Sequence, residues 1–419
     1  MTNKKIKDMI RSSNTTLKFS NTHKRDTLKL FVSEYQRVTS LFVDELWNTR
    51  DIPKLIPKDI TSKVKTQTWL SARAVQCSAK QASSIVRGTK KKNSQRRWRH
   101  KRLLEEGKIA NAKKLMGIIE KHKESKPSLN TICPELDSRF VKIDLDNETS
   151  FDGWLTLSSL GDKIKIELPF KRTKHMNKLM KRGTLKSGVR LLGDSLCLMF
   201  DLPDKPKKSR GNTLGLDIGI KKIFVTSDGQ RSNSDTHGWD LTKIQQRLSR
   251  RKKGSKRFAQ AQEHRQNFIH WSINQLNLTN TKELRIEKIK DLRKHKRTSR
   301  FLTHWTYSEI YDKLSRACEE SGVQMTHVSP TFTSQRCSQC GWTQETNRDE
   351  EEFQCKHCGF ATDADLNASV NIGLELLPIR RRERSSFDNR TGFFWEMMSE
   401  ERIVPRVQRA QDHENAHSS

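Results

Sequence analysis

Two cysteine pairs form the most regular chemical pattern in the sequence. Cys337-Ser-Gln-Cys340 and Cys355-Lys-His-Cys358 are both CxxC motifs followed by glycine, with a hairpin-length segment between them. Each CxxC turn brings two thiolates to one point, and two such turns on adjacent strands give the tetrahedral sulfur ligation that suits zinc. Because four thiolates leave no open coordination position, we expect one structural Zn²⁺. A four-sulfur iron site and redox thiols are the alternatives, and His357 is not expected to be a ligand.

Three acidic residues are candidates for a second kind of chemistry. Asp217 lies in the apolar segment LGLDIGIKK, Glu287 lies similarly in LRIEKI, and Asp365 begins DLNASVNIG just after the second cysteine pair. A buried strand seldom tolerates an unpartnered charge. Taken singly, each acid also fits an ordinary role, as a turn aspartate, a salt-bridged glutamate or a helix cap. Asp363 is a weaker candidate beside Asp365.

Taken together, the three acids fit a narrower chemistry. Three carboxylates at one point repel one another unless hard cations lie between them. Two Mg²⁺ ions about 4 Å apart can activate water and stabilise the leaving oxygen in phosphodiester hydrolysis. We therefore expect Asp217, Glu287 and Asp365 to act together as ligands of catalytic magnesium.

The composition indicates a polyanionic partner. The 419 residues contain 81 Lys+Arg against 49 Asp+Glu, a formal net charge of +32, and only 33% of them are hydrophobic. Nucleic acid is the partner that such a charge favours. The sequence has no apolar stretch of about 20 residues, so we expect no membrane partner. With no secretory signal and no disulfide-like cysteine framework, we place the protein in a prokaryotic or phage-encoded cytosol, associated with the nucleoid.

One basic run is the best candidate for nucleic-acid contact. Residues 87–102 hold nine Lys or Arg and no acid, with Trp98 among them. Arginine beside an exposed ring suits phosphate pairing and base stacking, although a solvated helix face or a disordered arm is the alternative. A second basic segment, RLSRRKKGSKR, lies in the second half of the chain. The candidate contacts are Arg96, Arg97, Trp98, Arg99, Arg251, Lys252 and Lys253.

Hydrophobic periodicity predicts the elements that must position these residues. A short strand is expected over 15–20, and helices over 24–47, 61–87 and 103–125. Short strand-like runs between Pro134 and Pro203 predict an antiparallel β unit that could close into a barrel, and 202–212 is a linker. Strands carrying Asp217 and Glu287 then alternate with helices over 241–276 and 305–320. The last residues, 379–419, show no period, and we expect them to be mobile or ordered by a partner.

The order of these motifs resembles the RuvC nuclease half of the TnpB-like transposon-associated proteins and the compact type V CRISPR effectors. GLDIGIKK, RLSRRKKGSK, RIEKIKDL, HWTYSEIYDKL, TFTSQRCSQCG, CKHCGF and DADLNASVNI follow one another over roughly 212–376. The resemblance implies an RNase H-like nuclease domain with Asp217, Glu287 and Asp365 as its metal-binding triad. It also implies that the four cysteines belong to a target nucleic-acid-binding insertion and that Arg336 lies near the cleaved strand.

The resemblance implies an α+β, multidomain, bilobed fold. A β-barrel wedge carries a helical recognition insert, and an RNase H-like α/β domain carries the zinc ribbon. The expected parts are, in order, the first wedge strand (1–23), the helical insert (24–133), the wedge barrel and linker (134–211), the first RuvC part (212–330), the ribbon (331–360), the last RuvC part (361–378) and a basic tail (379–419).

The function implied is RNA-guided cutting of double-stranded DNA with Mg²⁺, by a monomer or homodimer from a transposon or CRISPR-type locus. A guide RNA reads the target by base pairing while the protein reads a short flanking duplex motif. A guide-dependent repressor that has lost cutting, and an unguided zinc-ribbon DNA-binding or transposase-type protein, are the alternatives. The sequence departs from the family at Ser369 and Lys288, and neither change removes a carboxylate.

Overall fold

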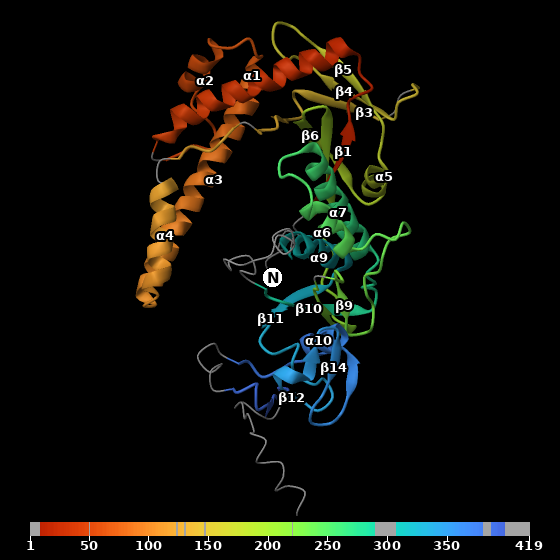
Figure 1. Cartoon of the computed structure of the whole chain (residues 1–419). Helices are drawn as coiled ribbons and strands as arrows, with labels where there is room; N and C mark the ends of the chain where they lie inside the picture. The colour runs from red at the N-terminus through yellow and green to blue at the C-terminus, as the bar shows by residue number, and fades with distance from the viewer. Residues whose placement is uncertain are drawn as a thin grey trace, which may run out of the picture. The chain divides into compact units, whose positions relative to one another are not determined.

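The computed structural model of the chain describes residues 9–49, 51–122, 125–129, 131–145, 148–219, 221–289, 307–379 and 387–398 (Figure 1). The chain divides into two compact units, Met1–Pro203 and Asp204–Ser419. The division falls inside the segment 202–212, whose Pro, Lys and Gly content marked it as a linker. Of the helices in these ranges, none has both the length and the apolar character that a bilayer crossing requires.

Helices dominate the first part of unit one. Helix α1 starts at Asn21, whose side chain accepts a hydrogen bond from the backbone N–H of Lys24, and α3 and α4 pack side by side. Apolar residues at three- and four-residue spacing give α1 one buried face. The helices of this unit are α1 (Thr22–Trp47), α2 (Lys58–Lys65), α3 (Ala72–Glu105), α4 (Ile109–His122) and α5 (Lys174–Met180).

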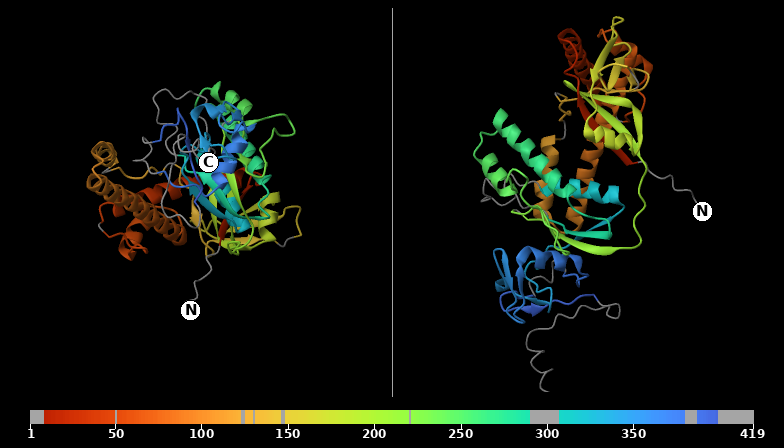
Figure 2. Two further views of the ribbon diagram at one scale, coloured as in Figure 1. Left: turned by 90° about the horizontal axis from the view of Figure 1, so that it is seen from below. Right: turned by 90° about the vertical axis from the view of Figure 1, so that its right-hand side faces the viewer.

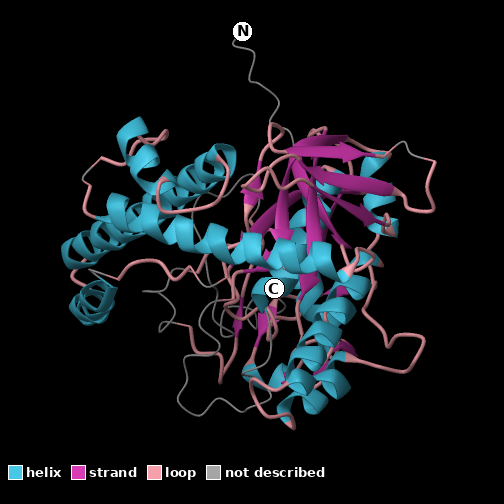
Figure 3. Ribbon diagram, turned by 90° about the horizontal axis from the view of Figure 1, so that it is seen from above, coloured by secondary structure: helices cyan, strands magenta, loops and turns pink. Residues whose placement is uncertain are grey.

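The strands of unit one form two antiparallel sheets beside α1 (Figure 3). One has the order β1-β7-β6-β2 and the other β3-β4-β5. The strands are β1 (Met9–Thr16), β2 (Glu135–Leu136), β3 (Val141–Asp144), β4 (Gly153–Leu157), β5 (Ile166–Phe170), β6 (Thr184–Leu192) and β7 (Ser195–Leu202). The first strand therefore starts and ends earlier than the strand expected over 15–20, and Leu17 begins the turn that follows it.

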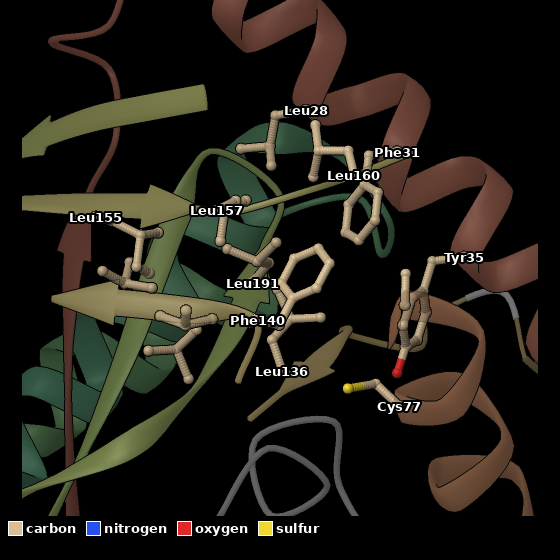
Figure 4. Close-up of a cluster of buried hydrophobic side chains, with 14 of the residues drawn as sticks. Leu28, Phe31, Tyr35, Cys77, Leu136, Phe140, Leu155, Leu157, Leu160 and Leu191 are labelled. Carbon is tan, nitrogen blue, oxygen red and sulfur yellow. The ribbon is translucent and has the colours of Figure 1, made fainter. Parts of the chain in front are cut away.

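The expected closed barrel is wrong for the described residues. No ladder of hydrogen bonds joins the four-stranded sheet to the three-stranded one. Instead, both sheets and α1 share a single hydrophobic core (Figure 4), so packing takes the place of barrel closure. Phe31 of α1 lies 5.8 Å from the Phe140 ring in that core, while Leu155 and Leu191 reach it from the two sheets.

Unit two is built on a mixed sheet of order β11-β10-β8-β9, comprising β8 (Asn212–Asp217), β9 (Val225–Thr226), β10 (Thr281–Glu287) and β11 (Gln324–Val328). The strands β8, β10 and β11 are parallel, and β9 is antiparallel to β8. Helices α6 (Leu241–Ser249), α7 (Lys256–Asn274) and α9 (Tyr307–Ser321) lie on one side of it, and α10 (Ala364–Gly373) lies on the other (Figures 1 and 2).

A small domain of short strands carries the four cysteines. Its elements are β12 (Trp342–Thr343), the 3₁₀ helix η1 (Glu345–Asn347), β13 (Arg348–Asp349), β14 (Glu352–Gln354), β15 (Ala361–Asp363) and β16 (Phe393–Phe394). Strand β16 pairs with β12, and Trp395 is buried. The segment 387–398, expected to be mobile or ordered by a partner, is instead ordered by contacts within the chain. Phe394 joins the core of this domain, and Phe393 and Trp395 pack with Phe332 and Leu377 in a neighbouring cluster. Residues 380–386 and 399–419 lie outside the described part.

Candidate functional site

Strand alternation places Asp217 and Glu287 on the same face of the sheet. Successive side chains of a strand point to opposite faces, and in both LGLD and LRIE the acid falls opposite the apolar positions. The apolar positions of the two strands pack into the core with α7 and α9: Leu214, Leu216, Leu284 and Ile286. The two acids therefore face the side that α10 covers, and both end their parallel strands at the carboxyl edge, where ligands of α/β sheets bind.

Gly215 of β8 lets α10 approach that face closely, near Gly373 at the end of the helix. A Cβ atom at Gly215 would lie 2.0 Å from the carbonyl oxygen of Ser369 and 2.3 Å from the backbone nitrogen of Gly373. Only a residue without a side chain fits there. This contact fixes the distance between α10 and β8. It thereby brings Asp365, in the first turn of α10, toward the strand that ends at Asp217.

The three predicted carboxylates line one pocket of about 520 Å³. Asp217 comes from the end of β8, Glu287 from the end of β10 and Asp365 from α10. Most of the remaining lining comes from the loops after β8 and β11 and from the β13–β14 hairpin, and includes Lys221, Pro330, Thr333, Arg348, Glu350 and Glu351. Acids from three distant segments of the sequence thus meet in one place.

Burial and mutual repulsion act on these carboxylates. Burial, with the negative charges of Glu287 and Asp365, raises the pKa of Asp217 to about 7. Burial also raises the pKa of Glu287, although the hydroxyl of Thr333 donates a hydrogen bond to its Oε1 and opposes the rise. The carboxylates of Asp217 and Glu287 are therefore held where their ionised forms are disfavoured, which is the situation that a cation in the pocket relieves.

Two cations of the chain partly neutralise the pocket. The Arg348 guanidinium lies 3.0 Å from Asp365 Oδ1, and Lys222 Nζ lies 3.8 Å from Asp365 Oδ2. Lys222 is closer to Asp363, at 2.9 Å. Asp363 itself caps α10, since its Oδ1 accepts the backbone N–H groups of Asp365 and Leu366. The capping role considered for Asp365 thus belongs to Asp363, and the carboxylate of Asp365 faces the pocket.

The donor set of the pocket fits Mg²⁺. Carboxylate oxygens are the ligands this ion takes, and it keeps several of its waters. Carboxylates spread around a pocket of about 520 Å³ leave room for those waters. Asp217 and Glu287 would hold an ion from the strand ends and Asp365 from α10.

The four cysteines form a much tighter group. Their Sγ atoms all lie within 4.8 Å of one another, with Cys337 and Cys358 at 3.7 Å and Cys340 and Cys355 at 3.6 Å. A tetrahedral site with Zn–S bonds of about 2.3 Å places sulfur atoms about 3.8 Å apart. The cluster thus fits a structural Zn²⁺ with no further ligand.

The two knuckles have the same backbone hydrogen bonds. Gly341 N–H donates to the Cys337 carbonyl at 3.0 Å, and Gly359 N–H donates to the Cys355 carbonyl at 3.0 Å. Both glycines have positive φ, +84° and +75°, which the turn requires. His357 is not in the cluster, and its ring lies 5.4 Å from that of Trp342.

Arg336 is not exposed for strand contact as the resemblance implied. It is 4% exposed, and its guanidinium donates to the carbonyl oxygens of Trp395 (2.7 Å) and Cys337 (3.1 Å) and to Asn371 Oδ1 (2.8 Å). Four thiolates around Zn²⁺ carry a net charge of −2, so a buried cation beside them is favourable. The structure gives Arg336 a structural place between the first knuckle, α10 and the C-terminal segment.

The other basic candidates lie on exposed surface. Arg97, Trp98 and Arg99 are exposed on α3, with Trp98 63% exposed and the Arg102 guanidinium 5.6 Å from its ring centre. Arg96 is less exposed and donates to Asn93. The second group sits between α6 and α7 and consists of Arg251, Lys252 and Lys253, of which the two lysines are exposed.

Sequence reasoning missed Arg348 and Thr333. Arg348 is the single basic residue in the acidic stretch 345–352, and that isolation was the available signal. Thr333, in TFTSQRC, carries no signal of its own, because its hydroxyl matters only once β11 and β10 are paired.

Comparison with known protein families gives a match at the cysteine domain. The family model described as the Cas12f1-like TNB domain matches residues 307–372. This span contains both knuckles and Asp365.

Three relatives share parts of the sequence. Cas12f1 of Sulfoacidibacillus thermotolerans, named a CRISPR-associated endodeoxyribonuclease, is 42% identical over 77 residues, 18% of this chain and 18% of the relative. A TnpB-like protein of Aquifex aeolicus is 33% identical over 92 residues, 20% of this chain and 30% of the relative. InsQ of Escherichia coli, named for an inferred RNA-guided DNA endonuclease activity, is 25% identical over 199 residues, 40% of this chain and 50% of the relative. The matches thus span half or less of each relative.

The fold is similar over a longer stretch. A solved Cas12f1 complex with sgRNA and target DNA aligns over 84% of this chain and 83% of that chain, with a TM-score of 0.51 and 14% identity. At this identity the likeness is one of fold, and it covers an α+β, multidomain architecture.

Proposed function

We propose that this TnpB-like chain, a relative of the compact type V effectors, is an RNA-guided DNA endonuclease that hydrolyses phosphodiesters at the carboxylate pocket with Mg²⁺. The observation that carries the proposal is the meeting of Asp217, Glu287 and Asp365 in one pocket. Two strand ends and α10 supply these acids, and α10 is also hydrogen-bonded to the first cysteine knuckle. In this proposal, residues 212–330 and 361–378 form the RuvC-type nuclease, and residues 331–360 form the zinc ribbon inserted in it.

The residues of the pocket divide the chemistry between them. Bound Mg²⁺ would supply water activation and stabilisation of the leaving oxygen. The carboxylate oxygens of Asp217 and Glu287 would coordinate the ion from the sheet edge, and those of Asp365 would coordinate it from the opposite wall of the pocket. Arg348 and Lys221 line the same pocket and supply positive charge for the phosphate of a bound strand.

Basic surfaces of the chain support a nucleic-acid partner. The net charge of +32 suits a guide RNA and a target duplex together. On α3, exposed Trp98 with Arg97 and Arg99 offers a ring for a base and guanidinium groups for phosphates. The lysines at 252 and 253, also exposed, offer further phosphate contacts.

The test begins with the RNA that the protein carries. The full chain is purified, its bound RNA is sequenced, and DNA matching the RNA is incubated with the complex and Mg²⁺. We expect cutting by the wild type and no cutting by Asp217→Ala, Glu287→Ala or Asp365→Ala, each still binding target DNA. Asp349→Asn, an exposed acid of the β13–β14 hairpin, is the matched control and cuts normally.

The outcomes separate the competing functions. If any of the three alanine variants cuts DNA at the wild-type rate, the carboxylate pocket is not the nuclease site. Guided binding with no cutting by the wild type would favour the repressor. Absence of any bound RNA would favour the unguided zinc-ribbon protein.

A further inference from the structure

The first cysteine knuckle is hydrogen-bonded directly to the helix that carries Asp365. Asn367, one helical turn before Asn371 on the same face of α10, accepts the backbone N–H of Ser338 at 3.0 Å and donates to the Arg336 carbonyl at 2.8 Å. Ser338 lies inside the first CxxC. Asn367 and Asn371 are each 1% exposed, so the amide groups of these side chains have no water to replace these partners.

Asn371 extends this network toward the carboxylate pocket. Its amide nitrogen donates to the carbonyl oxygens of Arg336 (2.7 Å) and Thr333 (3.0 Å), and its amide oxygen accepts from the Arg336 guanidinium (2.8 Å). One side chain therefore fixes both ends of the segment 333–336. The same guanidinium donates to the carbonyl of Trp395, which ties the C-terminal segment into the network.

Thr333 connects the network to a pocket carboxylate. Its hydroxyl donates to Glu287 Oε1, its backbone is held by Asn371, and it is 3% exposed. A buried carboxylate with one fixed donor has a preferred orientation. The path from the cysteine centre to Glu287 is thus continuous through Arg336, Asn371 and Thr333.

We propose that Thr333 is a positioning residue for Glu287 and that the zinc centre fixes Thr333 through Arg336 and Asn371, so that zinc in the ribbon strengthens cation binding in the carboxylate pocket. This rests on the proposed function only in taking the pocket as a Mg²⁺ site. The reciprocal effect follows by linkage: Mg²⁺ in the pocket strengthens retention of zinc by the same factor.

The first experiment isolates the hydroxyl of Thr333. Mg²⁺ is titrated calorimetrically into the full-length, zinc-loaded protein without DNA. A hydrogen bond to a charged group is worth roughly a factor of 10 or more in affinity. We expect Thr333→Val to weaken Mg²⁺ binding by about that factor, and Thr333→Ser, which keeps the hydroxyl, to restore it.

Thr331→Val is the matched control for this experiment. Thr331 lies two residues away, and its hydroxyl accepts from Ser329 rather than contacting the pocket acids. The Thr331→Val variant should bind Mg²⁺ with the same affinity as the wild type. Zinc content and thermal midpoint, measured on every variant, separate loss of position from loss of fold.

The second experiment tests the route from the zinc centre. Arg336→Lys keeps the charge but cannot make all three contacts of the guanidinium, whereas Arg390→Lys changes an exposed arginine of the same C-terminal segment. We expect Arg336→Lys to weaken Mg²⁺ binding while zinc remains bound, and Arg390→Lys to have no effect. If the two residues act along one route, the double variant Thr333→Val/Arg336→Lys is no weaker than Thr333→Val alone.

The possible results distinguish failure of the proposed function from failure of the coupling. Wild-type protein that binds no Mg²⁺ would overturn both the pocket as a nuclease site and its coupling to zinc. Wild-type protein that binds Mg²⁺, with Thr333→Val equal to it, would overturn the positioning role alone. Additive losses in the double variant would overturn the route through Arg336.

Discussion

The cysteine centre and the carboxylate pocket of unit two are assembled in opposite ways. Four sulfur atoms within 4.8 Å come from one short segment, 337–358, and two knuckles with identical backbone bonds hold them. The three carboxylates come from distant segments, and sheet order and helix packing bring them together against their repulsion. We therefore expect the small domain to need a bound metal ion for its fold, whereas the pocket needs the fold before it can bind an ion.

The largest effect should follow from breaking the cysteine centre. Cys337→Ser removes one of four ligands, and structural zinc sites contribute roughly 10 kcal/mol or more to the folding of small domains. We expect zinc to fall from about one ion per chain to none, with residues 331–360 becoming sensitive to protease. Elemental analysis and limited proteolysis measure this, with Cys133→Ser, outside the cluster, as control. Unchanged zinc content would show that the cluster is not a metal site.

How well each region could be predicted depends on whether its contacts join residues that are near or distant in the sequence. The cluster of four cysteines was predictable because each CxxCG segment contains both sulfur ligands and the turn that holds them within a few contiguous residues. Asp217 and Glu287 were predictable as a pair because an acid ending an apolar strand marks a sheet edge. Asp365 was grouped with them through the order of motifs that carries the family resemblance. The contact of Gly215 that brings α10 to β8 joins distant segments, and no local pattern in the sequence indicates it.

The next effect concerns the packing that builds the pocket. Gly215→Ala places a methyl group 2.0 Å from a backbone oxygen of α10, which only movement of the helix can relieve. We expect a loss of about 3 kcal/mol in unfolding free energy and loss of Mg²⁺ binding, with zinc retained. Denaturant unfolding and calorimetric titration test both.

Gly88→Ala is the control for this substitution. A Cβ there meets nothing within 4 Å in helix α3, and the change should stabilise the protein by roughly 0.5–1 kcal/mol. If Gly215→Ala binds Mg²⁺ as tightly as the wild type, Mg²⁺ binding in the pocket does not depend on the distance between α10 and β8.

Repulsion within the pocket predicts a smaller, pH-dependent effect. The folded state holds a proton on Asp217 up to about pH 7, whereas the unfolded chain releases it near the ordinary pKa of 3.8. Unfolding free energy of the Mg²⁺-free protein therefore falls as pH rises between these values. Asp217→Asn should be more stable than the wild type by roughly 1–3 kcal/mol at pH 8 and should lose the stabilisation by Mg²⁺.

Thermal unfolding at pH 6 and pH 8, with and without Mg²⁺, measures this difference. The gain should be larger at pH 8 than at pH 6, where the wild-type acid is mostly protonated. A variant less stable than the wild type at pH 8 would mean that the carboxylates do not repel one another in the folded protein.

What the sequence could not reveal in either region is the part made by long-range pairing. Burial of Arg336 follows from a strand pair, β12 with β16, whose members are two residues each. A run as short as Phe393–Phe394 has no period to detect. The expectation that Arg336 lies near the cleaved strand came from the resemblance alone, and no local pattern indicated its buried partners. Electrostatics explains the placement afterwards, because the cysteine centre with zinc carries negative charge that a buried guanidinium balances.

The smallest effect should come from replacing Arg348, a residue of the cysteine domain whose side chain lines the carboxylate pocket. Its guanidinium lies 3.0 Å from Asp365 and competes with Mg²⁺ for that carboxylate. We expect Arg348→Gln to tighten Mg²⁺ binding a few-fold and to lower the stability of the Mg²⁺-free protein by about 1 kcal/mol. Arg231→Gln, whose guanidinium lies 4.0 Å from Asp363, should leave Mg²⁺ affinity unchanged. Weaker Mg²⁺ binding by Arg348→Gln would mean that this arginine orients Asp365 for the ion, so that the cysteine domain contributes to the pocket instead of competing with its metal.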